Sequence, residues 1–518
     1  MPQNHIAQAR AAAVQALSSP ELARIVDLVA YPEPAPGHPT AVVVENVRGA
    51  VRLHRDGRHE VLRGEDPVAN TDPMAFLPYE RELADASPDN ERNAYPDPAR
   101  RLLGIFSDAD RSPDLVIVHH PGHYFPDEGG HRGEHGSLDV IQSRAPLLVA
   151  GAGVTKHGML DEHAFLIDVG PTMAAAAGVP LEDLRDAAGN QLDGKPLTHL
   201  VEPGRRRVVG LLWDGAHCGE LLAMAGRGDL PSLGRLLQRG AALRGGAVAE
   251  FPSLTLTNHT SILTGLGPGR HGVMGNVFYD RATGDQVVPN DASTWHRSSE
   301  WLRPKVRTVF DMVGQHRGEL PVPTASINEA IDEGAAYSTM GLIRAQNAGE
   351  GAAGLGALLP DPTTSPYVHN RRHLQYDYFS WATQVDDVGL AQVLQLWARP
   401  EQAPALTWWA TVVTDAGHHG GGPRSEMARD AFRDADARLA VLLDHLESEG
   451  VLDDVTFVLT ADHGFEGADV NRTGSWTPAL TAALEPFGIG WRDEGPGFVY
   501  LGVGDAPVSV TESTTPVS

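Results

Sequence analysis

The sequence predicts an α/β protein built around a mostly parallel β-sheet. Three observations lead to this prediction. Apolar segments of strand length alternate with helical segments, several strands end in Asp or His, and 56 glycines and 38 prolines provide for many connecting loops. In open sheets of this kind, ligands bind beyond the carboxyl ends of the strands. We therefore expect a functional site among the residues that follow these strands.

Strands and helices are expected throughout the first 200 residues. The opening range 5–30 is typical of one helix, and the Pro-, Asp- and Asn-rich range 64–100 indicates a long irregular loop. Short apolar segments predict strands at 41–45, 51–60, 114–120 and 145–150, and the range 167–179 predicts a helix that ends at a glycine.

The second part of the chain has strands that end in polar residues. Buried strands are predicted from VVGLLWD, which ends at Asp214, from LTWWATVVTD, which ends at Asp415, and from VTFVLTADHG. Helices are predicted around Leu230–Leu237 with a stop at Gly240, over 256–266, and over 425–449, where apolar residues recur every three or four positions. The less regular range 276–400 indicates an inserted cap that contacts substrate.

Composition narrows the class of function. The chain has 518 residues and a net charge of -26, which argues against binding nucleic acid or an acidic membrane through a basic surface. A single cysteine, Cys218, excludes an internal disulfide framework and a cysteine-based zinc site. The N-terminal segment lacks the pattern of a signal peptide, and no apolar stretch reaches about 18 residues, so we expect a cytoplasmic enzyme without a membrane span.

Four short stretches carry residues suited to metal and phosphate chemistry: Asp214, Thr255 with Asn258, Asp415 with His419, and Asp462 with His463. Zinc takes nitrogen and oxygen ligands from His and Asp, and two metals about 4 Å apart stabilise both the attacking and leaving oxygens of phosphoryl transfer. A threonine hydroxyl is a weak nucleophile until a metal or base activates it. Each residue alone is also explained as a helix cap, a turn residue or a hydrogen-bonded pair.

Asn258 lies three residues after Thr255, at a predicted helix start. Its amide is therefore expected to hydrogen-bond a phosphoryl oxygen of the substrate.

Taken together, these stretches resemble the alkaline phosphatase superfamily in its type I phosphodiesterase/nucleotide pyrophosphatase branch. GLGPGRHGVMGNVFYDRATG (265–284) is similar to the segment after the nucleophile loop of that branch, and PSLTLTN and GNVFYDR also resemble phosphonoacetate hydrolase. The resemblance implies a three-layer sandwich around a mostly parallel sheet. It also implies that one zinc binds Asp214, Thr255, Asp462 and His463, and that Asp415 and His419 bind the other.

The family places one more zinc ligand, a His-Gly pair, after the Asp-His pair, but no His follows His463 in this chain. A matching loop, GEHGS with His135, occurs early and precedes an apolar strand. We therefore expect a circularly permuted fold in which His135 completes the second site. Nearby alternatives are His131, His119, His120 and His123. The four-residue spacing from Asp415 selects His419 over His418, which is expected to line the site or bond a backbone carbonyl.

These expectations define the domains: 1–200 as the permuted C-terminal part of the catalytic domain, 201–275 and 401–505 as its remainder, 276–400 as the cap, and 506–518 as a disordered tail. Within the cap range, Tyr279 and the cluster Arg371-Arg372-His373 are candidate substrate contacts.

The expected function is a two-zinc phosphodiesterase that forms a phospho-threonine intermediate, with manganese or iron as alternative metals. The expected partner is a small-molecule phosphodiester or phosphonate, and no oligomeric state is predicted. The alternatives are a phosphonate hydrolase, a phosphomonoesterase, and a binding protein that has kept the fold without catalysis.

Overall fold

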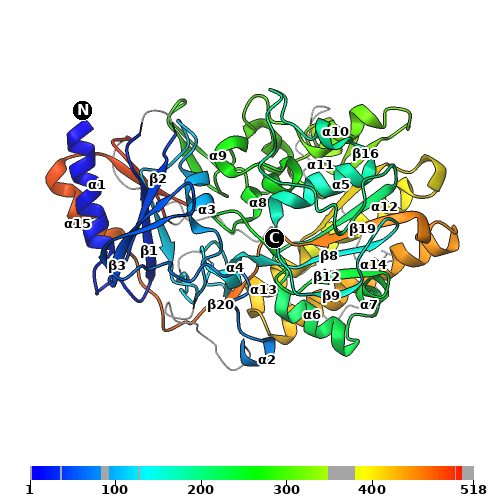
Figure 1. Ribbon diagram of the computed structural model, residues 1–518, viewed down its shortest axis with the longest axis horizontal. Coiled ribbons are helices and arrows are strands. Elements are labelled where there is room, and N and C mark those ends of the chain that lie inside the picture. The colour runs from blue at the N-terminus through cyan, green and yellow to red at the C-terminus, as the bar shows by residue number, and fades with distance from the viewer. Residues whose placement is uncertain are drawn as a thin grey trace.

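The computed structural model describes residues 3–35, 38–82, 93–126, 129–347, 380–495 and 497–504. Two large β-sheets lie next to each other along the long axis of the molecule (Figure 1). Among the described residues, no helix is long and apolar enough to span a membrane. The helices are α1 (Gln3–Leu17), α2 (Tyr79–Glu82), α3 (Pro98–Ile105), α4 (Val140–Ser143), α5 (Val169–Ala177), α6 (Cys218–Arg227), α7 (Pro231–Leu237), α8 (Thr255–Thr264), α9 (Pro268–His271), α10 (Val309–His316), α11 (Thr339–Asn347), α12 (Ser380–Leu396), α13 (Val413–Gly421), α14 (Glu426–Ser448) and α15 (Thr477–Leu484).

The larger sheet has eight strands. In spatial order these are β17 (Tyr337–Ser338), β16 (Thr324–Ile327), β18 (Leu406–Thr411), β11 (Arg207–Trp213), β19 (Val455–Thr460), β8 (Leu147–Gly151), β12 (Gly240–Leu243) and β9 (Gly158–Leu160). All neighbours are parallel except β8, which runs antiparallel to β19 and β12.

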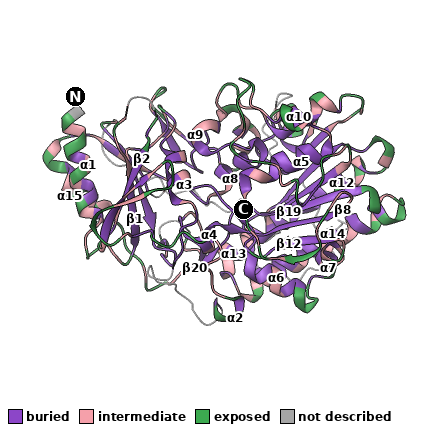
Figure 2. Ribbon diagram, in the orientation of Figure 1, coloured by how far each residue is buried: buried purple, intermediate pink, exposed green. Residues whose placement is uncertain are grey.

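Helices cover both faces of this sheet. In Figure 1, α5 and α10 lie on one side and α6 and α7 on the other. Every residue of β18 and β19 is buried, and Figure 2 shows this burial along the strands of the sheet. Near-continuous apolar strands are typical of parallel sheets packed on both faces. The structure thus confirms the predicted α/β fold with a mostly parallel central sheet.

The second sheet has seven antiparallel strands. In spatial order these are β21 (Trp491–Glu494), β22 (Phe498–Leu501), β5 (Leu115–His119), β1 (Val26–Pro32), β2 (Ala41–Glu45), β3 (Gly49–His54) and β4 (His59–Gly64). Helices α1 and α15 pack against each other beside this sheet, and their apolar residues share a core with β1, β5 and β22 (Figure 1). The two ends of the chain therefore build one sheet.

Short strand pairs complete the fold. A three-stranded sheet is formed by β10 (Ala164–Phe165), β13 (Ala247–Val248) and β7 (Arg144–Ala145), and two strand pairs are formed by β14 (Phe278–Asp280) with β15 (Asp285–Val287) and by β20 (Glu466–Gly467) with β6 (Gly133–Glu134).

The predicted helix over 5–30 is wrong in its second half. Helix α1 ends at Leu17, and β1 begins at Val26. Residues of β1 pair with β2 on one side and with β5 on the other, and those ladder hydrogen bonds outweigh the helix-like sequence pattern. The expected strand 51–60 is likewise two strands, β3 and β4, joined by a turn in which Gly57 has a positive φ of 83°.

The strand expected to reach Asp415 ends earlier, at Thr411. Helix α13 then starts at Val413, so Asp415 lies in its first turn. The Asp386 carboxylate, on α12, accepts hydrogen bonds from the backbone N–H groups of Val412 and Val413 at 2.9 and 3.1 Å. The Asp386 carboxylate thus satisfies backbone N–H groups at the N-terminus of α13, although it belongs to the preceding helix. Gly240, the expected stop of a helix, is instead the first residue of β12, because α7 ends at Leu237.

Part of the range expected to form a cap belongs to the central sheet. Strands β16 and β17 lie within 276–400 and form one edge of the eight-stranded sheet. The division into domains stays a prediction. The cluster Arg371-Arg372-His373 and the tail 506–518 lie outside the described residues.

Candidate metal centre

The expected ligands meet at one edge of the central sheet. Asp214 follows β11, Asp462 and His463 follow β19, and the helix after β18 carries Asp415 and His419. Because β18, β11 and β19 are parallel neighbours, their carboxyl ends point to the same edge. A pocket of about 130 Å³ opens there, between this edge and strands β5 and β22 of the second sheet.

His135 lies among these ligands although it comes from the first third of the chain. Its Nε2 is 3.2 Å from His419 Nε2, and its ring stacks on that of His463 with centroids 3.7 Å apart. His419 Nε2 is also 3.5 Å from Asp415 Oδ1. The ligand atoms of His135, Asp415 and His419 lie within 4.8 Å of one another, and so do those of Asp214, Asp415 and His463.

The unpaired atoms of this cluster fit bound cations. Four buried ligand atoms make no hydrogen bond to the described residues: Asp214 Oδ1, Asp415 Oδ1, Asp462 Oδ2 and His463 Nε2. Of these, Asp462 Oδ2 and His463 Nε2 form an ion pair 3.1 Å apart. A buried polar atom without a partner is costly, and a cation coordinated by these atoms would remove that cost. Burial and the neighbouring carboxylate of Asp462 raise the pKa of Asp214 well above its usual range. A cation at this site favours the ionised carboxylates.

The histidines are oriented as ligands. The Nδ1–H groups of His135, His419 and His463 donate to the carbonyls of Ser253, Gly133 and Gly464, each at 3.0 Å. This leaves the Nε2 atoms facing the cluster, an arrangement common in protein metal sites. Burial opposes charge on His463, but the carboxylates of Asp462, Asp214 and Asp415 raise its pKa to about 9, so a bound cation would displace the proton from its Nε2. Burial lowers the pKa of His135 well below its usual value and that of His419 to about 3. Both rings are therefore neutral, the form that binds metal.

Thr255 is the first residue of α8 and lines the same pocket as His135, Asp415 and His419. A helix N-terminus presents free backbone N–H groups and the positive end of the helix dipole. Thr255 is thus placed where a phosphate group and a cation can both reach it. Asp214, Asp462 and His463 lie deeper, with 0 to 5% of each residue exposed.

Asn258 does not line this pocket. It is fully buried, its Oδ1 accepts from the Glu250 N–H at 2.7 Å, and its Nδ2 donates to the carbonyls of Pro252 and Leu254. These bonds use both amide hydrogens. The expected contact with a phosphoryl oxygen is therefore corrected: Asn258 braces the loop that leads into Thr255.

Tyr279 is also away from the pocket. Its ring makes an edge contact with Tyr500 at 5.6 Å between centroids, and the Arg492 guanidinium lies 5.1 Å from its ring centre. With 8% of the residue exposed, it is a packing residue of β14 and not the expected substrate contact.

Sequence reasoning overlooked Asn276, which lines the pocket. Its Oδ1 accepts the backbone N–H of Leu256 at 3.1 Å, and its NH₂ group remains as a donor beside Thr255. It lies inside the stretch GNVFYDR, so the motif contained the residue without indicating which side chain faces the site.

His259 was overlooked as well. Its Nε2 lies 3.7 Å from Asp214 Oδ2 and 3.6 Å from Asp462 Oδ2, while Nδ1 is 2.9 Å from Glu329 Oε2. His259 follows Thr255 by one helical turn, and this spacing was the available indication.

The other histidines near the centre have distinct positions. His418 is buried and its Nδ1–H donates to the Thr414 carbonyl at 2.6 Å, as expected for a residue that is not a ligand. The Nε2 of His119 contacts the His135 carbonyl at 3.2 Å, so this loop supports the His135 loop. The His131 ring lies 4.2 Å from that of His419, and His131 stays an alternative ligand.

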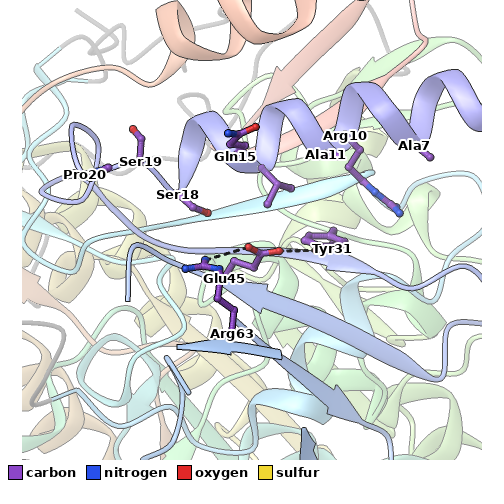
Figure 3. Close-up of a pocket in the computed structure, with 11 residues that line it drawn as sticks. Ala7, Arg10, Ala11, Gln15, Ser18, Ser19, Pro20, Tyr31, Glu45 and Arg63 are labelled. Atoms are coloured by element: carbon purple, nitrogen blue, oxygen red, sulfur yellow. Dashed lines mark hydrogen bonds and ion pairs between the residues drawn. The ribbon is translucent and has the colours of Figure 1, made fainter. Parts of the chain in front are cut away.

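A larger hollow of about 540 Å³ lies between α1 and strands β1, β2 and β4 of the second sheet (Figure 3). Its charged groups are already engaged: Glu45 accepts from the Tyr31 hydroxyl at 2.7 Å and pairs with Arg63 at 3.4 Å, and Arg10 lies over the Tyr31 ring. Among the described residues, none of the groups with metal-ligand geometry lies there. The smaller pocket at the metal centre is therefore the candidate site.

Comparison with known proteins gives one family. The profile of the type I phosphodiesterase / nucleotide pyrophosphatase family matches residues 208–501. The chain is 32% identical over 123 residues to alkaline phosphatase PafA of Elizabethkingia meningoseptica, covering 24% of this chain and 21% of that protein. It is 36% identical over 96 residues to the uncharacterized pyrophosphatase/phosphodiesterase C725.05c of Schizosaccharomyces pombe, covering 17% of this chain and 20% of the relative. The chain thus matches about a fifth of the length of these relatives.

Two solved structures are similar at low identity. Murine ectonucleotide pyrophosphatase / phosphodiesterase 5, in an inactive form in complex with AMP, is 16% identical with a TM-score of 0.36, covering 50% of this chain and 57% of that one. Phosphonoacetate hydrolase from Sinorhizobium meliloti 1021 in complex with phosphonoformate is 24% identical with a TM-score of 0.32, covering 50% and 56%.

Proposed function

This chain belongs to the type I phosphodiesterase / nucleotide pyrophosphatase family, and from that premise we propose that it is a two-metal hydrolase of phosphodiester bonds with Thr255 as nucleophile. One observation carries the proposal. Thr255, at a helix N-terminus, lines a pocket with His135, Asp415 and His419, and two groups of metal-ligand atoms link these residues to the buried Asp214 and His463.

The ligand sets follow the family resemblance, and the proximity of His135, Asp415 and His419 supports the second of them. Asp214, Asp462, His463 and the Thr255 hydroxyl are assigned to one zinc, and Asp415, His419 and His135 to the other. Manganese or iron would suit the same nitrogen and oxygen donors. When bound, two such cations lower the pKa of a coordinated hydroxyl or water and stabilise negative charge on phosphoryl and leaving oxygens.

The chain's own residues then carry out a two-step transfer. Thr255 Oγ forms a bond to phosphorus, the bond from phosphorus to the leaving alkoxide breaks, and a phospho-threonine results. Water then cleaves this ester, which restores the hydroxyl and releases a phosphomonoester. The N-terminus of α8 and the NH₂ group of Asn276 are placed to hydrogen-bond the phosphoryl oxygens.

The protein lining of the pocket is acidic, so positive charge toward a phosphoryl group would come from the bound cations. Among the described residues that line the pocket, none is an arginine or lysine, whereas Glu134 and Asp415 are acidic. A diester carries one negative charge, and a phosphomonoester or phosphonoacetate carries more. The preference for a diester is therefore inferred from the family match and not from this lining.

We also propose that the fold is circularly permuted. The family match begins at residue 208, yet the ligand His135 and strand β8 both precede it and lie in the centre and in the central sheet. Joined termini and a new cut in a surface connection leave such packing intact.

Initial rates of the zinc-loaded protein on bis-(p-nitrophenyl) phosphate and p-nitrophenyl phosphate test the function. We expect a preference for the diester and a loss of at least about 10³-fold in kcat for Thr255→Ala. Thr481→Ala, at an exposed threonine of α15, is the matched control. A Thr255→Ala variant that hydrolyses the diester at the wild-type rate would contradict the nucleophile assignment. A protein that binds zinc but cleaves neither ester would be the non-catalytic relative.

A further inference from the structure

A buried carboxylate and a histidine lie behind the first zinc site, the one assigned to Asp214 and Asp462. Glu329 is fully buried, and His259 has only 5% of its surface exposed. Neither of them lines the catalytic pocket, and the two-step transfer gives neither a role. One ring nitrogen of His259 contacts Glu329, and the other faces the two ligand carboxylates. The pair therefore connects the frame of the fold to the metal ligands.

Glu329 reaches the ligand cluster by the same route as the ligands. It follows β16, which is parallel to β18, so the carboxyl end of β16 lies at the edge where the ligands meet. The residue between, Asn328, has a positive φ of 55°, which turns the chain directly after the strand. The Asn328 side-chain amide donates to the Val385 carbonyl at 2.9 Å, and this bond anchors the turn.

The Glu329 carboxylate is held firmly. Its Oε1 accepts the Ile331 backbone N–H at 2.9 Å, and its Oε2 accepts the Trp408 indole N–H at 2.8 Å. His259 Nδ1 lies 3.1 Å from Oε1 and 2.9 Å from Oε2, and since a carboxylate only accepts, Nδ1 carries the hydrogen. These bonds fix the ring with Nε2 pointing away from Glu329. Carboxylates orient histidines in this way around protein metal sites.

The Nε2 of His259 lies between the two ligand carboxylates. It is 3.7 Å from Asp214 Oδ2 and 3.6 Å from Asp462 Oδ2. Both separations are longer than a hydrogen bond, so the ring limits the rotation of these carboxylates as a polar contact. The other oxygen of Asp214, Oδ1, lies 3.9 Å from His463 Nε2. Asp214 thus turns one oxygen toward His259 and the other toward the cluster.

His259 also belongs to the helix that carries the nucleophile. It follows Thr255 by four residues on α8, so the two side chains lie on the same face of that helix. The bond to Glu329 fixes this face against the end of β16. A rotation of α8 about its axis would displace Thr255 and His259 together.

We propose that Glu329 and His259 are positioning residues of the first zinc site. Glu329 fixes the ring of His259, and the ring in turn holds the two ligand carboxylates in the orientation that binds the cation. The inference rests on the proposed function for the identity of the site. Neither residue is assigned a contact with substrate.

Two substitutions at one position test the proposal. The amide nitrogen of asparagine takes the place of a histidine Nδ1, and that of glutamine takes the place of Nε2. His259→Asn therefore keeps the bond to Glu329 and loses the contact with the carboxylates, whereas His259→Gln keeps that contact. We expect the affinity for one of the two zinc ions to fall about 10- to 100-fold in His259→Asn and to recover in part in His259→Gln.

A role confined to the fold predicts the opposite order, because only His259→Asn keeps the bond to Glu329. Wild-type zinc affinity in a folded His259→Asn variant would overturn the proposal. Glu329→Gln should keep most of the affinity, because its amide oxygen still accepts the Nδ1–H. His271→Gln is the matched control, since His271 is buried and its Nε2 lies 3.0 Å from Ser261 Oγ on the same helix. An equal loss of zinc in His271→Gln would refute a specific role for His259.

NMR of the cobalt-loaded protein separates positioning from ligation. The ligand-type atoms of Asp214, His259 and Asp462 lie within 4.8 Å of one another, so direct binding of a cation by His259 is the competing assignment. We expect cobalt-shifted imidazole N–H signals from the three proposed histidine ligands alone. A fourth such signal that disappears in His259→Asn would make His259 a ligand and overturn the positioning role.

Zinc affinity is measured without catalysis, so this proposal and the proposed function fail separately. If His259→Asn weakens zinc binding but the wild type cleaves no diester, the positioning role stands and the function fails. If the diester is cleaved and His259→Asn changes neither zinc affinity nor kcat, the positioning role is refuted and the function stands. If the wild type binds neither zinc nor manganese, both are refuted.

Discussion

Replacing His135 with alanine tests the metal centre. His135 is the ligand whose place in the chain, before all the others, was least expected. The proposed second site has three candidate protein ligands, His135, Asp415 and His419, whose donor atoms lie within 4.8 Å of one another. His135→Ala removes one of the three, and the imidazole it removes is half-buried and already oriented by the Ser253 carbonyl.

The size of the loss can be estimated from zinc energetics. Tetrahedral zinc sites contribute about 10–16 kcal/mol through four ligands, or about 3 kcal/mol for each ligand. At 1.4 kcal/mol for each factor of ten, losing one ligand weakens binding by roughly 10²-fold. We expect the bound zinc to fall from two ions per chain to one after dialysis against a weak chelator, while the site around Asp214 and His463 keeps its ion.

The assay is metal content by plasma mass spectrometry, together with competition against a zinc indicator. His131→Ala is the comparison variant, because His131 is the alternative ligand and its ring lies 4.2 Å from that of His419. A His135→Ala protein that keeps two tightly bound ions refutes the reasoning, and loss of an ion from His131→Ala instead assigns the ligand to His131.

Two further predictions concern residues that support the site and the second sheet. Asn258→Ala should lower the free energy of unfolding by roughly 1–3 kcal/mol and lower kcat, because the loop before Thr255 loses buried hydrogen bonds. A variant with unchanged melting temperature but reduced kcat would mean that Asn258 touches substrate. Burial raises the pKa of Asp27 to about 7 from 3.8, despite the hydrogen bond donated by Tyr95 at 2.7 Å. The folded state therefore holds this proton more tightly than the unfolded chain, and stability falls by about 4 kcal/mol as pH rises from about 4 to about 7. Asp27→Asn should flatten that decline in a melting-temperature profile, and an identical profile for both proteins would contradict the shift.

The central sheet could be predicted because its strands are nearly continuous apolar runs. β11, β18 and β19 are buried along almost their whole length, and each is followed by a metal-ligand type of residue. Local sequence therefore contains both the strand and its polar end. The parallel arrangement then brings the polar ends together without further information.

The second sheet could not be predicted in this way. Its strand β5 pairs with β1 and with β22, which lie far apart in sequence. Such pairings depend on tertiary packing, and the segment that becomes β1 continues the helix-like pattern of α1. The predicted substrate contacts of Asn258 and Tyr279 were wrong for a related reason. A motif names the residue but does not determine which neighbour its side chain contacts.

The position of His135 shows why a change in chain order leaves such a centre intact. Strand β6, which ends at Glu134, pairs with β20, which follows the Asp462–His463 loop. The N–H of Arg132 donates to the His419 carbonyl at 2.8 Å, and the His419 ring donates back to the Gly133 carbonyl at 3.0 Å. The His135 loop is thus fixed by hydrogen bonds to helix α13, which carries His419, and to strand β20, which follows Asp462 and His463. Those bonds require that the loops be adjacent in space, and they are indifferent to the order in which the chain reaches them.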